Sequence, residues 1–355
     1  MNARVVAPVP WFPFSASIFG RYAILAKVVP RETRAGLDVE HPKYPLLPKI
    51  GMTMVPGWLA AASLPVLKRL QRERDFDLID AHYLFPDGVA AVRLGRRLKK
   101  PVVMTARGTD VNLIPQFPRA RRMIVAAAHE AAAIVAVSQA LKDAIVALGV
   151  PSEKVTVLRN GVDLVLFQPH AREKARAELA LCERTLVSVG HLIERKGHEL
   201  VIGALPLLPG YSLLIAGEGP ERARLERLAK ELNVSHRVRF LGSIPHGQLH
   251  EIYAAADALV LASSREGWPN VLLEAMACGT PVVASNIWGN PEVVSRPEAG
   301  VLMKERTAEG VAEGVNRLFH QLPDREATRR YAERFSWDAT SEGQLRLFQD
   351  ILHRR

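Results

Sequence analysis

The chain has 355 residues, enough for two domains of ordinary size. Hydrophobic residues make up 48% of it, so we expect a substantial core and exclude wholesale disorder. Its two cysteines, Cys182 and Cys278, have no metal-like spacing. They fit a reducing compartment and indicate neither a disulfide framework nor a zinc site. We expect no signal peptide, because no charged segment followed by an apolar run opens the sequence.

The excess positive charge lies entirely in the first half of the chain. Residues 1–169 contain 23 Lys and Arg against 13 Asp and Glu, whereas the remaining residues contain 24 of each. This asymmetry predicts an anionic partner, a lipid surface or a polyanion, with an ordinary solvated surface as the equally weighted alternative. We expect no nucleic acid partner, because aromatic residues do not interleave the basic ones and no zinc-finger or RNP pattern occurs.

Apolar runs and helical segments alternate along the first half. Segment 50–67 is its longest uncharged stretch, but Pro56, Gly57 and Pro65 interrupt it, so we do not expect it to span a membrane. It is interpreted as a core helix or, with the basic run that follows, as a segment at a membrane surface. The predicted helices cover 86–99, 118–131 and 138–148, and the predicted strands are RVVAPV (4–9), DLIDAH (77–82), PVVMTA (101–106), IVAVS (134–138) and KVTVL (154–158).

A turn-rich connection, RNGVDLVLFQP (159–169), separates this half from the second. Beyond it, continuous apolar runs alternate with helix-period segments, which indicates a parallel sheet covered on both faces. The last segment, 335–352, is an amphipathic helix that we expect to dock on the first domain. The predicted strands are TLVSVG (185–190), SLLIAG (212–217), RVRFLG (237–242), ALVLAS (258–263) and PVVAS (281–285).

The expected fold is therefore α/β, with two Rossmann-like domains facing a cleft. We place the N-terminal domain at 1–163 and the C-terminal domain at 164–336. The C-terminal helix, 337–355, would cross back to the N-terminal domain.

Two carboxylates flank an almost wholly apolar run in EGWPNVLLEAMACGTPVV (266–283). Pro269 suits a first helical turn and Gly279 a C-terminal cap, so a buried helix is predicted between them. Glu274 on this helix carries a desolvation cost unless it is hydrogen-bonded. Sugar or ribose hydroxyls would do that, and a buried Arg or Lys partner is the alternative. Glu266 follows a strand end, where parallel sheets bind ligands.

A second cluster lies in SVGHLIERKGHELVI (188–202). A strand ends at Gly190, and a short loop then brings Arg195 and Lys196 to its carboxyl end. Two adjacent cations there can neutralise a pyrophosphate, Arg bidentately and Lys as a point charge. Alone, this string is typical of a solvated turn, and only its combination with the two carboxylates indicates a phosphate site.

These two motifs, joined by LLIAGEGPER and RVRFLGSIP, resemble those of the retaining GT4-type glycosyltransferases of the GT-B fold (glycosyl transferases group 1). The spacing from Glu266 to Glu274 matches the E-x7-E signature of that family. The resemblance is specific and continuous over about 184–296 and looser over the rest of the chain. VVAPVPWFPF, HPKYPLLP and TARGTDV resemble the branch that builds surface polysaccharides.

The resemblance implies that the second domain binds a nucleotide-diphosphate sugar. Arg195 and Lys196 would hold the diphosphate and Glu274 the ribose hydroxyls, while Glu266 would lie beside the transferred sugar. Glu266, Arg195 and Lys196 would act catalytically in a front-face attack that retains configuration, with no metal and no other cofactor. The remaining donor-binding residues would be Gly190, Ile244, Gly267, Trp268, Pro269, Asn270 and Val271.

Acceptor-side residues are expected in the first domain. His82 follows a strand and would orient a hydroxyl, with a packed or surface histidine as an even alternative. Many relatives have histidine at the position of Arg107, which can make a similar hydrogen bond. Asp110 would bind an acceptor or cap a helix.

The N-terminus departs from the family pattern. Members usually begin with a strand, a glycine-rich loop and a helix before a stretch like RVVAPVPWFP, which starts here at Arg4. We therefore expect the first βα unit to be missing, through a start codon assigned too late or, less favoured, a true truncation.

Two other strings resemble binding motifs weakly. Asp75-Phe76-Asp77 has the DxD form but begins a strand instead of ending one, so the exposed start of a strand is favoured over a manganese site. GEGPER (217–222) has half of a dinucleotide fingerprint and lacks its third glycine, so it is weak evidence for NAD.

The leading hypothesis is a glycosyltransferase that moves a sugar from a nucleotide-diphosphate donor to a glycan or lipid-linked acceptor in polysaccharide biosynthesis. It would be cytoplasmic and peripheral on the inner face of the plasma membrane, whose anionic surface the basic first domain would contact. The alternatives are a GT-B-like sugar-nucleotide epimerase, a non-catalytic or weakened truncated GT-B protein that acts as a glycan-assembly partner and, last, an NAD-dependent dehydrogenase.

Overall fold

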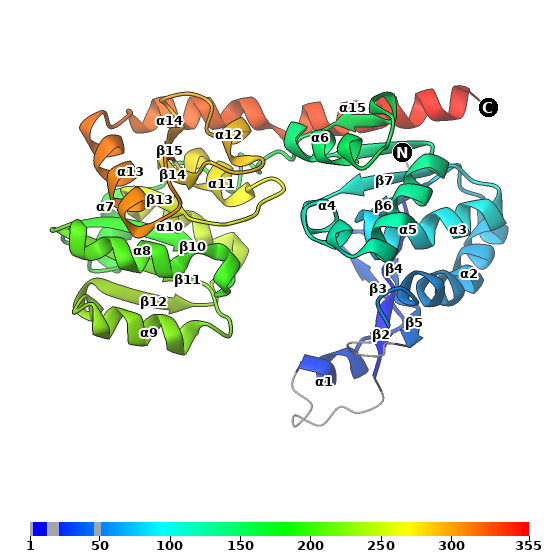
Figure 1. Ribbon diagram of the computed structural model, residues 1–355, viewed down its shortest axis with the longest axis horizontal. Coiled ribbons are helices and arrows are strands. Elements are labelled where there is room, and N and C mark those ends of the chain that lie inside the picture. The colour runs from blue at the N-terminus through cyan, green and yellow to red at the C-terminus, as the bar shows by residue number, and fades with distance from the viewer. Residues whose placement is uncertain (1–2, 13–20, 46–50, 355) are drawn as a thin grey trace. The chain divides into compact units, whose positions relative to one another are not determined.

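The computed structural model describes residues 3–12, 21–45 and 51–354, which form two compact units (Figure 1). VVAPVPWFPF, HPKYPLLP and the start of segment 50–67 lie partly outside these residues. The predicted domain boundaries and the missing first βα unit stay predictions. The first unit comprises Met1–Ala136, Lys142–Thr156 and Leu347–Arg355, and the second comprises Val137–Leu141 and Val157–Arg346.

The second unit is built on a six-stranded sheet that is parallel throughout. Its inner strands are buried and rich in Val, Leu and Ile, as both faces are covered. The strand order is β12-β11-β10-β13-β14-β15, so the chain starts in the middle, winds outward to β12 and then returns to the other side of β10. The strands are β10 (Arg184–Val189), β11 (Tyr211–Ala216), β12 (Val238–Gly242), β13 (Ala258–Leu261), β14 (Val282–Ser285) and β15 (Gly300–Met303).

Helices cover both faces of this sheet (Figure 1). Helices α8, α9 and α13 pack on one face through apolar side chains such as Ile202, Leu225 and Val315. Helices α10 and α11 pack on the other face, flanked by α7 and α14. The unit is thus the doubly wound domain predicted from the sequence. The helices are α7 (Arg172–Glu178), α8 (His198–Ala204), α9 (Arg222–Glu231), α10 (Leu249–Ala255), α11 (Asn270–Ala277), α12 (Asn290–Val293), α13 (Ala308–His320) and α14 (Arg325–Ala332). The last helix, α15 (Trp337–His353), belongs to this unit up to Arg346 and to the first unit from Leu347.

The first unit contains a four-stranded sheet of order β6-β7-β8-β9 and two smaller sheets, β1-β4-β3 and β2-β5. Neighbours β6, β7 and β8 pair in parallel, and α2, α3 and α5 pack beside them. The elements are β1 (Val5–Val6), β2 (Val9–Trp11), α1 (Arg21–Ala26), β3 (Arg31–Arg34), β4 (Leu37–Glu40), β5 (Lys43–Pro45), α2 (Val55–Glu73), β6 (Ile79–His82), α3 (Val89–Leu98), β7 (Val102–Ala106), α4 (Thr109–Asn112), α5 (Pro118–Glu130), β8 (Ala133–Ala136), α6 (Gln139–Ala147) and β9 (Val155–Val157).

The predicted strands and helices are present, with their ends shifted by a few residues. One predicted strand, RVVAPV, is divided into β1 and β2, because Pro8 between them has no amide hydrogen to donate. The hairpin of β3 and β4 was not predicted. Its strands are mostly exposed and charged, and β3 has no apolar residue. They turn through Ala35 and Gly36, both at positive φ.

Segment 50–67 continues into the long helix α2. Its buried side chains pack against α3: Val55, Leu59 and Ala60 form one apolar cluster with Ala90 and Leu94. At these positions α2 is therefore a core helix, as the first interpretation predicted. Over residues 3–12, 21–45 and 51–354, every helix is too short or too polar to cross a membrane.

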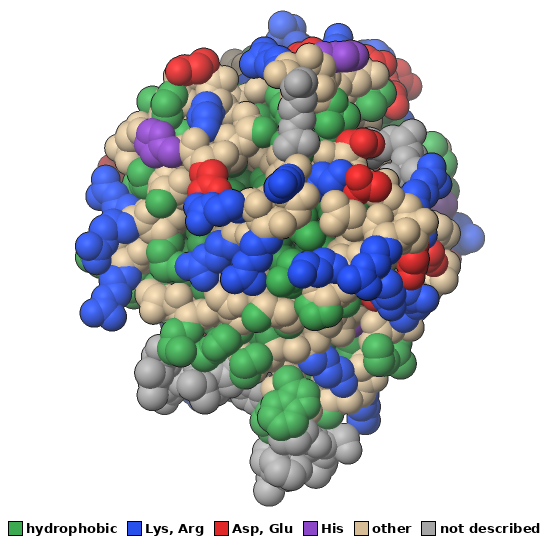
Figure 2. Space-filling view, turned by 90° about the vertical axis from the view of Figure 1, so that its right-hand side faces the viewer, with side chains coloured by type: hydrophobic (Ala, Val, Ile, Leu, Met, Phe, Trp, Pro, Cys, Tyr) green, Lys and Arg blue, Asp and Glu red, His purple; other side chains and the backbone are tan. Residues whose placement is uncertain are grey.

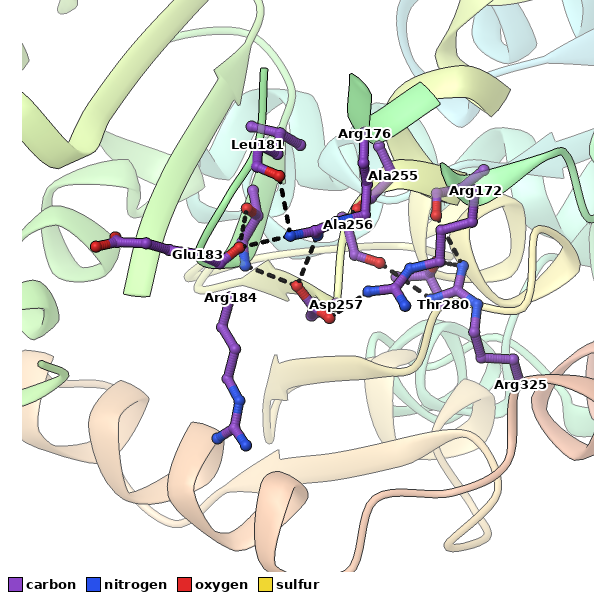
Figure 3. Close-up of polar contacts among 12 residues, drawn as sticks. Arg172, Arg176, Leu181, Glu183, Arg184, Ala255, Ala256, Asp257, Thr280 and Arg325 are labelled. Atoms are coloured by element: carbon purple, nitrogen blue, oxygen red, sulfur yellow. Dashed lines mark hydrogen bonds and ion pairs between the residues drawn. The ribbon is translucent and has the colours of Figure 1, made fainter. Parts of the chain in front are cut away.

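A partly buried arginine, Arg325, joins α14 to the ends of two other helices in the second unit (Figure 3). Arg325 donates to carbonyl groups at the C-terminal ends of α10 and α11, where unpaired carbonyls and the helix dipole favour a cation. Burial, together with the nearby Arg172, lowers the pKa of Arg325 to about 10. Its acceptors are the carbonyl oxygens of Ala256 (3.0 Å), Ala254 (3.1 Å) and Cys278 (3.2 Å) and the hydroxyl of Thr280 (2.8 Å).

Asp257 anchors α7 to the same edge of the sheet (Figure 3). Its carboxylate accepts hydrogen bonds from Arg172, from Arg176 at 3.1 Å and from the backbone amide of Thr185 at 2.8 Å. Because Asp257 directly precedes β13 and Thr185 lies in β10, this group also joins the two central strands.

Replacement of Arg325 by Met is expected to lower the free energy of unfolding of the second unit by about 2–4 kcal/mol, because helix-terminal carbonyls lose a partly buried charged donor that they share. Urea unfolding followed by circular dichroism measures the change. The control is Arg330→Met in the same helix, whose pair with Glu326 is exposed; its effect should stay within about 0.5 kcal/mol. Equal effects of the two substitutions would contradict the capping role of Arg325.

Candidate active site

The reversal of strand order places two loops at one point on the carboxyl edge of the second unit's sheet. Strands β10 and β13 are parallel neighbours, so the loops that follow them leave the sheet side by side. The first loop ends in a short 3-10 turn, η5 (Glu194–Lys196), and the second leads into α11. In open parallel sheets, ligands bind at this kind of position.

The two loops meet at Glu266. Lys196 Nζ donates a hydrogen bond to Glu266 Oε1 at 2.7 Å, and Arg195 Nη1 lies 3.8 Å from the same oxygen. Arg195 also donates to the carbonyl of Arg265 at 2.7 Å. Glu266 is only 9% exposed, and its pairing with the two cations offsets the cost of burying its charge. The structure thus brings together the three residues predicted to act catalytically.

Two glycines allow the loops after β10 and β11 to touch through their backbones. Gly190 has φ 146° and lies against the Lys196 side chain. Gly217 has φ 144°, and a Cβ atom there would lie 1.9 Å from the carbonyl oxygen of Gly190. No residue but glycine fits this approach. Backbone packing therefore accounts for the first glycine of GEGPER without a dinucleotide.

Helix α11 carries Glu274 as its one charged residue. Tyr253 Oη donates to Glu274 Oε2 at 2.9 Å, and His246 Nε2 donates to Oε1 at 3.1 Å. The residue is 8% exposed. Within the described chain its partners are thus a tyrosine and a histidine, and the alternative of a buried Arg or Lys partner is wrong. Gly279 follows the helix with φ 78°, as predicted for its C-terminal cap.

The other predicted donor residues lie around these groups. Trp268 is 6% exposed and packs against the guanidinium of Arg159 and the ring of Phe335. Ile244 lies in the loop after β12, two residues before His246. Gly267 is buried, Pro269 directly precedes α11, and Asn270 and Val271 are the first two residues of that helix.

A buried histidine supports the loop that carries the cations. His198, the first residue of α8, is 2% exposed, and its Nδ1 lies 2.9 Å from the hydroxyl of Ser188 on β10. Burial, together with the nearby charge of Lys196, lowers the pKa of His198 to about 4. The imidazole is therefore neutral at neutral pH and holds the start of α8 against β10.

In the first unit, β6 and β7 place two predicted acceptor-side residues together. His82 ends β6, and Arg107 follows β7. The Arg107 guanidinium donates to His82 Nδ1, and His82 Nε2 lies 3.5 Å from a carboxylate oxygen of Asp80. The His82 side chain is 51% exposed, so it is not a packed histidine, but this exposure agrees with the surface-histidine alternative, and its role in orienting a hydroxyl stays a prediction.

Asp110 is fully buried and holds the backbone of its own loop. Its carboxylate accepts hydrogen bonds from the amides of Leu84 (2.7 Å), Gly108 (2.8 Å) and Arg107 (3.1 Å). Burial raises the pKa of Asp110, while these amides oppose the shift. These amides all precede α4, which has no side-chain cap, so Asp110 does not cap that helix and instead fixes the backbone before it. Binding of an acceptor by Asp110 stays a prediction.

The DxD-like string lies between α2 and β6, and so precedes a strand as predicted. Asp75 pairs with Lys100 at 2.7 Å. Over the part of the chain that the structure describes, His, Cys, Asp and Glu side chains form no group of three or more that could hold a metal ion.

Sequence reasoning did not single out Tyr253, His246 or His198. A signal existed for Tyr253, because a tyrosine in the apolar helix EIYAAA needs a partner for its hydroxyl group. His246 lies in a polar turn 28 residues before Glu274, and no periodic pattern joins the two. These residues meet their partners only through tertiary packing, which a local sequence pattern does not reveal.

Solved structures show which fold the two units form. Sucrose-phosphate synthase from Thermosynechococcus elongatus superimposes with a TM-score of 0.78 at 24% identity, over 93% of this chain and 87% of that chain. Anabaena HepE, solved in complex with UDP, superimposes with a TM-score of 0.75 at 22% identity, over 88% and 86%. The architecture is the GT-B fold of glycosyltransferases.

Sequence comparisons give the family. Residues 24–166 match Glycosyltransferase Family 4, and residues 171–335 match Glycosyl transferases group 1. TuaC of Bacillus subtilis, assigned to teichuronic acid biosynthesis as a glycosyltransferase, is 31% identical over 82% of this chain and 73% of its own length. N-acetyl-alpha-D-glucosaminyl L-malate synthase of Bacillus anthracis is 29% identical over 74% and 70%. The chain belongs to the GT4-type glycosyltransferases and is a transferase.

Stability is expected to fall as the pH drops below about 6.5, because His198 then takes up a proton in the unfolded chain while it stays neutral in the folded one until the pH approaches 4. Between pH 7.5 and 5, this residue should remove about 2 kcal/mol from the free energy of unfolding. Urea unfolding at both pH values measures the loss. A His198→Gln variant should show a smaller loss, whereas exposed His236→Gln should behave like the parent. Identical pH dependence in all three would contradict this assignment.

Proposed function

We propose that this glycosyltransferase binds a nucleotide-diphosphate sugar at the carboxyl ends of β10 and β13 and transfers the sugar with retention of configuration. The observation that carries the proposal is the convergence of Lys196 and Arg195 on Glu266, beside a helix that buries Glu274. Structures of HepE with UDP and with UDP-glucose support the class of donor. The family supports the assignment of roles.

Each charged group has one task in this proposal. Arg195 and Lys196 bind the diphosphate, whose negative charge replaces that of Glu266 as their partner. Released from this pairing, Glu266 accepts hydrogen bonds from the hydroxyls of the transferred sugar. Glu274 accepts those of the ribose. The start of α11, with its amides and positive dipole end, adds to the attraction for the anion.

The reaction breaks the bond between the anomeric carbon and the diphosphate oxygen and forms one to an acceptor hydroxyl on the same face. The leaving phosphate takes up the proton of that hydroxyl. Negative charge grows on the departing diphosphate, and cations fixed before the reaction stabilise it without reorganisation. Arg195 and Lys196 supply this charge, and we propose that no metal ion is needed.

The acceptor is proposed to be a glycan or lipid-linked glycan in polysaccharide biosynthesis, as the assignment of TuaC supports. His82 and Arg107 would hydrogen-bond its hydroxyl groups. Asp110 would fix the conformation of the Arg107 loop, because its carboxylate accepts hydrogen bonds from the backbone amides of that loop.

The first unit is also proposed to rest on the anionic inner face of the plasma membrane, which makes the enzyme cytoplasmic and peripheral. Figure 2 shows Lys and Arg side chains gathered in a band across one face. Exposed cations concentrate toward the C-terminal ends of α2 and α3 and just beyond them: Lys68, Arg72, Arg74, Arg93, Arg97 and Lys99. Each cation near such a surface contributes about 1 kcal/mol of attraction.

A thermal-shift panel with UDP-, GDP- and ADP-sugars tests the donor site, since a ligand that binds only the folded state raises its stability. One nucleotide class should stabilise the parent and Lys230→Ala, an exposed control on α9, but not Arg195→Ala/Lys196→Ala.

Activity tests the reaction itself. With that donor and a matching acceptor, kcat/KM of the double variant should fall by about 100-fold or more. EDTA should leave the rate unchanged, and NMR of the product should show the retained anomer. In the thermal-shift panel, equal stabilisation of the parent, Lys230→Ala and the double variant would contradict the assigned donor site.

Sedimentation with vesicles tests the membrane surface. The parent should bind phosphatidylglycerol-containing vesicles and not phosphatidylcholine vesicles, more weakly as salt is added. Lys68→Ala/Arg72→Ala/Arg97→Ala should lower binding by about 100-fold. A matched triple variant of exposed cations in the second unit, Arg227→Ala/Lys230→Ala/Arg296→Ala, should bind as the parent does. Equal losses in both triple variants would contradict a specific face.

A further inference from the structure

The two carboxylate oxygens of Glu274 have partners of opposite character. Oε2 accepts a hydrogen bond from Tyr253, which is fully buried. Oε1 accepts one from His246, whose side chain is 64% exposed. One oxygen is therefore held from inside the unit and the other from its solvent side.

The inner contact is permanent. Tyr253 lies on α10 and Glu274 on α11, two helices packed against each other. Burial, together with the neighbouring carboxylate, raises the pKa of Tyr253 well above its ordinary value, so the phenol stays a neutral donor. Breaking this bond would leave a buried hydroxyl and a buried carboxylate oxygen without a partner. Tyr253 thus fixes the orientation of the carboxylate.

The outer contact is easily displaced. His246 begins a short 3-10 turn, η8 (His246–Gln248), and its ring packs edge-on against Phe167 with the ring centres 5.1 Å apart. Water competes for the imidazole, which is mostly exposed, whereas the Glu274 side chain is only 10% exposed, so the imidazole gains little from holding this contact. A ligand hydroxyl group can therefore take the place of the imidazole at Oε1 at low cost.

We propose that His246 is a displaceable cover on Oε1 of Glu274, and that Tyr253 is the positioning residue that presents this oxygen to the ribose of the donor. The inference rests on the proposed function, because it takes Glu274 as the ribose contact. On binding, a ribose hydroxyl donates to Oε1, and the His246 side chain moves into solvent. Oε2 stays with Tyr253. The free protein thus satisfies a buried carboxylate through Tyr253 and His246, without engaging Arg195 or Lys196.

Isothermal titration with two probes tests the inference. The first probe is whichever of UDP, GDP and ADP stabilises the parent most, and the second is its 2′,3′-dideoxy analogue, which lacks the ribose hydroxyls. His246→Ala should tighten binding of the first probe by about two- to five-fold, because a weak competitor is gone, and leave the second unchanged. Tyr253→Phe should weaken the first by roughly ten-fold and the second hardly at all. His236→Ala, an exposed histidine in the turn before β12, should change neither constant.

The outcomes separate this inference from the proposed function. Weaker binding of the first probe by His246→Ala would mean that the imidazole contacts the ligand, which overturns the cover. Equal losses for both probes with Tyr253→Phe would mean a general structural role, which overturns the positioning of the ribose oxygen. A parent that binds none of the three nucleotides overturns the proposed function, and the inference with it.

Discussion

The site depends on one constraint of topology, the reversal of strand order between β10 and β13. Crossovers between parallel strands are right-handed, so helices on the two sides of this junction lie on opposite faces of the sheet. The loops after the two strands then lead to helices on opposite faces, but close to the sheet their backbones stay in contact, and the Ser264 amide donates to the Arg195 carbonyl at 2.9 Å. Arg195 and Lys196 come from one loop and Glu266 from the other, which is why residues 70 positions apart form an ion pair.

The charges of the free site balance within the second unit. Glu266 neutralises a cation that would otherwise attract any passing anion, and Glu274 is satisfied by two side chains that carry no permanent positive charge. The two buried carboxylates thus solve the same desolvation problem differently. An ion pair leaves the cations ready to exchange one anion for another, whereas the hydrogen bonds from Tyr253 and His246 hold Glu274 without engaging those cations.

Much of the fold could be predicted because buried parallel strands form continuous apolar runs, as in TLVSVG and ALVLAS. Strands β3 and β4 could not, since they are mostly exposed and carry the composition of a loop. Of the site, the loop positions of Glu266 and Lys196 follow from strand ends and could be inferred. The partners of Glu274 could not, because Tyr253 and His246 reach it through the packing of α10 on α11, which depends on side-chain shape.

The contact between Gly190 and Gly217 has a mechanical consequence. Where two loops meet through side chains, rotamer changes absorb small displacements, but here carbonyl and amide groups meet directly, and the Gly190 amide is bonded to the Ala216 carbonyl at 2.9 Å. Such a joint is stiff. The loop that carries Lys196 and the loop after β11 must therefore shift as one body, so that strain at either is transmitted to the other.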